Sequence, residues 1–166
     1  LSELKKILYF ITTSTPDKFS INKLAGTLEK ESRTIEKYIN ILIKTDLLRS
    51  VKKSGFGHTT IKRHSKILLE NPTMYYSFLQ NTSRRPEEIG AIRECFVLKQ
   101  LEDNKYKVLQ SKKGDFLVDD KHTFEIGGNS KTSEQIKNVK NSYLLKDIFI
   151  SVNKKTIPMY LFGFLS

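Results

Sequence analysis

Three short apolar stretches with helical spacing constrain the fold of this chain more than any other feature. They cover residues 4–11, 21–28 and 35–43, and in each the apolar side chains recur at intervals of three and four residues. That spacing places them on one face of a helix. Ser20 stands where an N-cap is expected for the second helix. The sequence therefore predicts three amphipathic helices within the first 45 residues.

A hairpin is expected directly after these helices. Residues 47–51 have the composition of a strand, Gly55-Phe56-Gly57 supplies a turn, and Thr59-Thr60-Ile61 is predicted to return as the partner strand. Three helices followed by a hairpin is the element order of a winged helix-turn-helix. We therefore predict such a domain over residues 1–70.

The third helix has the position of a recognition helix, which enters the major groove with its N-terminal residues on base edges. Its outward face supplies four candidates for DNA contact: Arg33, Thr34, Lys37 and Asn40. The alternative is a domain that contacts proteins and has a solvated polar face. Glu36 lies among the four candidates and would repel phosphate.

Net charge favours a polyanionic partner. The chain has 29 Lys and Arg against 18 Asp and Glu, for a formal charge of +11. Residues 47–69 contain no acid. The candidates for backbone contact there are Lys52, Lys53, Lys62 and Arg63, with Arg49 and Lys66 in the same run. Basic surfaces bind nucleic acid through phosphate contacts, so duplex DNA is the predicted partner, and lysine used only as solvent cover is the alternative.

The chain is expected to be cytoplasmic and to have no membrane partner. No apolar run approaches the roughly 18–20 residues that cross a bilayer, and the N-terminus does not have the pattern of a signal peptide. Cys95 is the single cysteine and is expected to be a small core residue.

The second half is predicted to be a small α/β domain over 86–166, joined by a connector over 71–85. The pattern indicates a helix from 86 to about 101, a strand near 106–108, two strands around a tight turn at Asp120-Lys121, a helix over 131–139 and a strand at 143–145. This is the element order of the PD-(D/E)XK nuclease core, a restriction-endonuclease-like fold.

That nuclease core holds a divalent ion with carboxylates. Asp119 and Glu125 are the predicted metal ligands for Mg²⁺ or Mn²⁺, which prefer oxygen donors. Glu94 is the candidate extra acid, and Lys131 is the candidate lysine because Gly127 stands at the usual lysine position. The alternative is that Asp119 is a turn residue and Glu125 a solvated strand residue.

Several blocks resemble, in order, the C-terminal region of a family of prokaryotic AAA+ ATPases. The blocks are Gly90-Ala91-Ile92-Arg93-Glu94-Cys95-Phe96, Val118-Asp119, Phe124-Glu125-Ile126-Gly127-Gly128, Ser130-Lys131-Thr132, Gln135-Ile136-Lys137, Ile157-Pro158 and Leu161-Phe162-Gly163-Phe164-Leu165. In that family a winged helix and a nuclease-like domain follow the ATPase. The resemblance implies that this chain is the C-terminal part of such a protein, because it contains no phosphate-binding P-loop.

The sequence thus predicts an α+β chain in which a winged helix precedes a nuclease-like domain. The predicted function is engagement of duplex DNA as the regulatory C-terminal region of an ATPase. A metal-dependent nuclease and a protein-interaction module that docks on an ATPase domain are the two alternatives.

Overall fold

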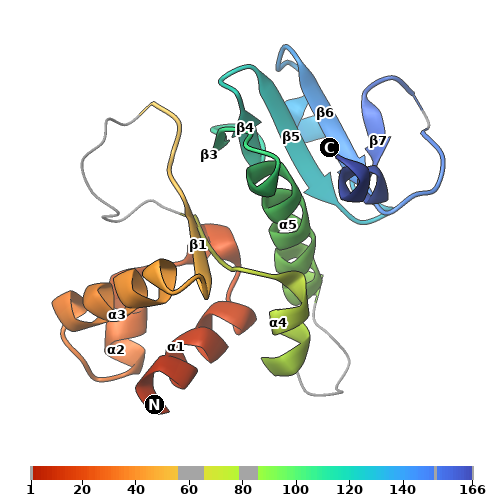
Figure 1. The fold of residues 1–166 in the computed structure, drawn as a ribbon. Helices are drawn as coiled ribbons and strands as arrows, with labels where there is room; N and C mark the ends of the chain where they lie inside the picture. Colours follow the sequence, from red (N-terminus) through yellow and green to blue (C-terminus); the bar gives the residue numbers. More distant parts are fainter. Residues whose placement is uncertain (1, 56–65, 79–85, 152, 166) are drawn as a thin grey trace. The chain divides into compact units, whose positions relative to one another are not determined.

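The computed structural model describes residues 2–55, 66–78, 86–151 and 153–165, which form a mixed α+β structure (Figure 1). The chain divides into two compact units. The first unit comprises residues 1–51 and 59–95, and the second comprises 52–58 and 96–166. The first unit therefore extends past the predicted boundary at residue 70 and takes in the first half of the long helix that we expected to open the second domain.

The first unit begins with the three predicted helices. These are α1 (Ser2–Thr13), α2 (Ile21–Thr27) and α3 (Ser32–Lys44), with a short 3₁₀ helix η1 (Pro16–Lys18) between the first two. Ser20 caps α2 by accepting a hydrogen bond from Lys23 N. Ile7, Leu24 and Ile35 are completely buried, so the apolar faces that the spacing predicts form a common core.

A two-stranded antiparallel sheet completes the helical core. Strand β1 (Leu48–Val51) pairs with β2 (Lys66–Leu69), with Leu48 opposite Leu69 and Val51 opposite Lys66. The predicted partner strand at 59–61 lies outside the described residues. All four residues of β2 are buried, and α4 (Pro72–Phe78) follows, placing Tyr75 in the core.

The second unit contains a five-stranded sheet with the order β3-β4-β5-β6-β7. The strands are β3 (Val108–Gln110), β4 (Phe116–Val118), β5 (His122–Gly127), β6 (Ser142–Lys146) and β7 (Thr156–Pro158). The first three strands are antiparallel, and β5, β6 and β7 run parallel. The chain enters this unit from α5 (Pro86–Asp103) and closes with the 3₁₀ helix η3 (Met159–Phe164).

The predicted helix over 131–139 is wrong. The structure forms only the short 3₁₀ helix η2 (Glu134–Ile136) there. Ile136 is the buried residue of this helix, and most of its neighbours are exposed polar residues. A helix needs an apolar stripe to bury, so the segment instead covers the sheet as a turn-rich loop.

Alternation along the strands gives the sheet two different faces. One face carries Phe116, Phe124 and Leu145, and Phe124 meets Phe162 of η3 edge to face with ring centroids 5.6 Å apart. The opposite face carries Glu125 on β5 and Leu144 on β6, which are partners in the parallel register. The buried polar residues of the strands lie on this opposite face, namely Thr123, Glu125, Ser142 and Thr156.

Candidate nucleic-acid interface and carboxylate site

Helix α3 presents one apolar and one polar face. Ile35, Ile39 and Leu42 are buried, whereas the side chains of Arg33 and Lys37 are exposed. Of the other two sequence candidates, Thr34 and Asn40 are half-buried beside them. The structure thus places all four predicted DNA-contacting residues on one helix, away from its buried stripe.

The turn between α2 and α3 holds the start of α3 in place. Glu29 adopts a left-handed conformation (φ 52°), and Lys30 N donates to Ala25 O at 3.0 Å. Ser32 Oγ donates to Asn22 Oδ1 at 2.9 Å, which links the first residue of α3 to α2. These contacts fix the first turn of α3, where Arg33 and Thr34 lie.

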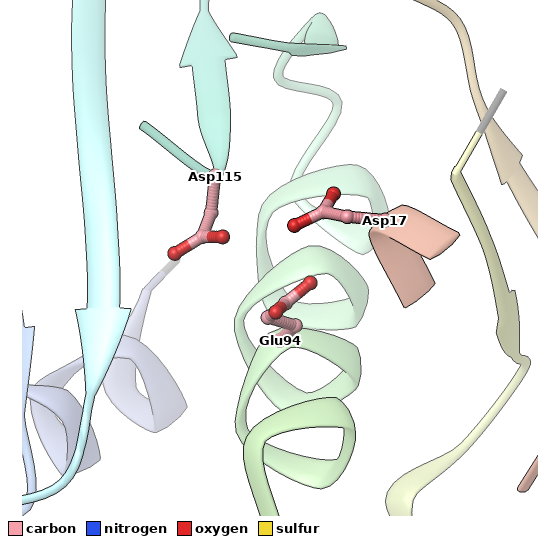
Figure 2. Close-up of side chains that lie close together, drawn as sticks. All are labelled: Asp17, Glu94 and Asp115. Atoms are coloured by element: carbon pink, nitrogen blue, oxygen red, sulfur yellow. The ribbon is translucent and has the colours of Figure 1, made fainter. Parts of the chain in front are cut away.

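Two of the basic residues of the acid-free run are used inside the first unit. Arg49 on β1 forms an ion pair with Glu70. Lys66 on β2 is completely buried, and its Nζ lies 2.6 Å from Glu94 Oε2 and 3.1 Å from Asp17 Oδ1. Figure 2 shows the side chain of Asp17 on η1 and that of Glu94 on α5. These ion pairs neutralise part of the positive charge of residues 47–69. Much of the rest of that segment lies outside the described residues, so α3 is the basic surface that the structure describes best.

The four remaining candidates for backbone contact fall into two groups. Lys62 and Arg63 lie outside the described residues. Lys52 and Lys53 belong to the second unit, where Lys52 O accepts a hydrogen bond from Gln110 N at 2.7 Å. Ser54 N then donates to Gln110 O at 3.0 Å. The segment after β1 thus runs beside β3, and the side chain of Lys52 is exposed.

Glu94 belongs to the first unit, although we predicted it as an extra acid of the nuclease-like domain. Its carboxylate binds the buried ammonium of Lys66. This ion pair joins β2 to α5. The structure therefore gives Glu94 a partner that the sequence analysis did not consider, because β2 was not predicted.

Asp119 is not brought to Glu125. It lies in the turn between β4 and β5 with a positive φ of 49°, is exposed, and its Oδ1 accepts from Lys107 N at 3.0 Å. The register pairs Val118 with His122, so Asp119 lies in the turn at the far end of the hairpin, and Glu125 is three residues, about 10 Å, further along β5 than His122. The predicted Asp119–Glu125 metal pair is therefore not formed, and Asp119 is the turn residue of the alternative interpretation.

Asp115 lies directly before β4 (Figure 2) and hydrogen-bonds to β5 on both sides of Glu125. Its backbone N donates to Phe124 O at 2.9 Å, and its Oδ2 accepts from Ile126 N at 2.7 Å. These two hydrogen bonds flank Glu125 on both sides. Asp115 is buried, as is Glu125, which is 1% exposed. Asp115 thus bonds to the residues on either side of Glu125, and both acids are buried within the second unit.

Lys131 is placed beside Glu125, as the sequence analysis expected. Its Nζ forms an ion pair with Glu125 Oε1. A Cβ built on Gly127 would lie 2.4 Å from Lys131 Cγ and 2.5 Å from Lys131 Cβ. The lysine stem thus fills the space next to residue 127, where the nuclease motif has a lysine of its own. Gly127 is required for this packing because any side chain there would collide with Lys131.

Tyr75 and Cys95 are buried in the first unit, and both form a hydrogen bond with the backbone of Leu69. Leu69 N donates to the Tyr75 hydroxyl at 3.3 Å, and Cys95 Sγ donates to Leu69 O at 3.1 Å. Burial raises the pKa of the Tyr75 phenol, and the nearby Cys95 adds to the shift. Cys95 is completely buried, which confirms the prediction of a core residue.

The arrangement in the second unit has the donor set of a hard divalent cation. Asp115 and Glu125 are buried acids whose carboxylate oxygens are the ligand type that Mg²⁺ and Mn²⁺ prefer, and Lys131 forms an ion pair with Glu125. Within the described residues, no helix combines the length and apolar character required to cross a membrane. No family model, no curated protein and no solved structure matches this chain.

Proposed function

We propose that the chain binds duplex DNA, with the first unit acting as a winged helix-turn-helix and α3 as its recognition helix. The observation that carries the proposal is the polar face of α3, where Arg33 and Lys37 are exposed opposite a fully buried apolar stripe. Exposed cations at the start of such a helix can reach phosphates and guanine edges. The excess of 14 basic over 7 acidic residues in the first 70 residues supports the same partner.

The test is a fluorescence-anisotropy titration of a labelled generic duplex. We expect the double variant Arg33→Ala/Lys37→Ala to bind at least about tenfold more weakly, since two cationic contacts are lost. The double variant Lys5→Ala/Lys18→Ala removes two exposed lysines outside α3 and is the matched control. Equal weakening in both variants would contradict a role for α3, and the absence of any binding would favour the protein-interaction module.

The second unit supports a second candidate function, metal-dependent cleavage of phosphodiesters. The observation that favours it is a pair of buried acids close in the fold: Asp115 Oδ2 accepts a hydrogen bond from Ile126 N, and the adjacent Glu125 forms an ion pair with Lys131. Asp115 and Glu125 would hold Mg²⁺ or Mn²⁺, which supplies Lewis-acid activation of water and phosphate when bound. The ammonium of Lys131 would stabilise negative charge developing on the phosphate.

This candidate is tested with a supercoiled plasmid incubated with the chain and Mg²⁺ or Mn²⁺. We expect nicking that is lost in Asp115→Asn and in Glu125→Gln, because each change removes a charged ligand. Asp119→Asn is the control, since the structure separates Asp119 from the site. Nicking that survives in Glu125→Gln would show that the cleavage comes from elsewhere.

A further inference from the structure

An open pocket of about 430 Å³ lies at the start of the parallel strands β6 and β7 in the second unit. Its volume falls within the range of small-ligand sites, about 300–1,000 Å³. Three lysines line it, namely Lys137 from the end of the η2 segment and Lys154 and Lys155 from the turn before β7. Neither of the functions proposed above uses this pocket.

The lining combines positive charge with an apolar floor. All three lysines are exposed, whereas Ile136 and Leu144 are buried at 2% and 4% exposure. None of the lining residues is acidic. One nearby acid is Glu125, the register partner of Leu144, which forms an ion pair with Lys131. Another is Glu134, whose Oε1 lies 3.7 Å from Lys137 Nζ. Both of these groups are largely exposed, so their attraction is weak and does not cancel the positive charge.

Hydrogen bonds hold both walls of the pocket. On one side, the single proton of the Ser142 hydroxyl is shared between Val139 O at 2.8 Å and Ile136 O at 3.1 Å. On the other side, Asn153 Oδ1 accepts from Lys155 N at 2.8 Å, and Lys155 O accepts from Leu144 N at 2.8 Å. The lysine-bearing segments are thus anchored to β6, and a ligand would meet walls that are already formed.

We propose that this pocket binds a phosphate ester of nucleotide size. The phosphate would lie among the ammonium groups of Lys137, Lys154 and Lys155, and the ring would lie on Ile136 and Leu144. Lysine binds phosphate as a point charge, and three lysines can share the two negative charges of a phosphate monoester. The ligand is either a free nucleotide or the phosphorylated end of a strand, because both present this chemistry.

Adenosine 5′-monophosphate is the first probe, titrated into the ¹⁵N-labelled chain at low ionic strength. We expect saturable shifts of the backbone amides at 133–137 and 153–156, with a Kd of about 1 mM or tighter. Inorganic phosphate is expected to bind more weakly because it has no ring. The absence of saturable shifts at these amides, or equal affinity for the two probes, would overturn the proposal.

The charge dependence is tested with Lys137→Gln/Lys154→Gln/Lys155→Gln, which should lower the affinity at least tenfold. Lys105→Gln/Lys112→Gln/Lys121→Gln removes the same charge from exposed lysines of the same unit that do not line the pocket. Equal weakening by both triple variants would show a general charge effect and contradict a specific site.

The source of the phosphate is tested with a short 5′-phosphorylated oligonucleotide. Tighter binding of the oligonucleotide than of the mononucleotide assigns a strand end as the ligand, and the reverse assigns a free nucleotide. Because the pocket does not involve α3, duplex binding by Arg33 and Lys37 can fail without affecting this result.

Discussion

The two units bury charge in opposite ways. In the first unit the buried charge is a cation, Lys66, whose side chain is fully inaccessible and binds carboxylates from two other elements. In the second unit the buried charge is an anion, Glu125, whose cationic partner Lys131 comes from the following loop and stays 37% exposed. A buried charge is costly unless it is paired, so both arrangements need their partners.

The difference separates a structural ion pair from one suited to binding. Lys66 joins β2 to η1 and α5, three elements that are distant in the sequence, and its partners fix how they pack. Lys131 lies six residues after Glu125 and reaches it from a surface loop. Because the side chain of Lys131 is partly exposed, its ammonium can leave Glu125 to another cation while the stem stays packed beside Gly127. The metal chemistry that we propose therefore belongs to the second unit, whereas the ion pair of the first unit stabilises the fold.

The largest expected effect is on the first unit. Lys66→Met leaves the carboxylate of Glu94 without its buried partner, and we expect the free energy of unfolding to fall by about 3–5 kcal/mol. Urea unfolding followed by circular dichroism measures the change. Adding Glu94→Gln to the same variant should recover part of the loss. A change below about 0.5 kcal/mol, the level of an ordinary surface substitution, would show that Lys66 is not a structural ion pair.

The packing of Lys131 against Gly127 gives a second test. Gly127→Ala places a methyl group against the lysine stem, and we expect it to destabilise the chain by about 1–3 kcal/mol. Combining it with Lys131→Ala should remove most of that cost, because the colliding atoms are gone. The double-mutant cycle measures this coupling. Additive effects would show that the stem of Lys131 does not occupy the space beside residue 127.

Metal binding is expected to stabilise only the second unit. At a Mn²⁺ concentration tenfold above its Kd, the gain in unfolding free energy should be about 1.4 kcal/mol. Thermal unfolding with and without Mn²⁺ measures it, and Glu125→Gln should abolish the gain. Lys66→Met/Glu94→Gln, the control in the first unit, should keep it. Loss of the Mn²⁺ effect in that control would contradict the separation of roles between the units.

The smallest effect concerns Tyr75 and high pH. Burial raises the pKa of this phenol, so above about pH 10 the folded chain keeps a proton that the unfolded chain loses. Stability should therefore fall as the pH rises above 10, by at most about 1.4 kcal/mol per pH unit from this group. Urea unfolding of the wild type and of Tyr75→Phe between pH 9 and 11, taken as about the range of phenol titration, measures the difference. If the free energy of unfolding depended on pH in the same way in both proteins, burial would not raise the pKa of the Tyr75 phenol.

The helices of the first unit could be predicted from the sequence because each one buries a single apolar face. The spacing over 4–11, 21–28 and 35–43 reports that face directly, and the structure buries Ile7, Leu24 and Ile35 as expected. Strand β2 was missed because Ile67-Leu68-Leu69 is a continuous apolar run without alternation. Such a run does not distinguish a buried strand from part of a helix.

The position of Asp115 relative to Glu125 depends on the register of the hairpin formed by β4 and β5. A two-residue turn at Asp120-Lys121 would pair Phe116 with Glu125, whereas the observed turn of three residues pairs Phe116 with Phe124. Composition does not decide between the two turns, since aspartate tolerates the positive φ that both Asp119 and Asp120 adopt. This difference of one residue brings Asp115, rather than Phe116, to the part of β5 that carries Glu125. The contact of Lys131 with Glu125 could be predicted because position 127, where the nuclease motif has a lysine, is a glycine, and Lys131 is the next lysine along the chain.

The most direct test of DNA binding through α3 is the salt dependence of duplex affinity. Each phosphate contact contributes about 0.9 to the slope of log K against log salt concentration. We predict that Arg33→Ala/Lys37→Ala reduces the magnitude of this slope by about 2, while Lys5→Ala/Lys18→Ala leaves it unchanged. The same slope and affinity in both variants would contradict the assignment of α3 as the DNA-binding face.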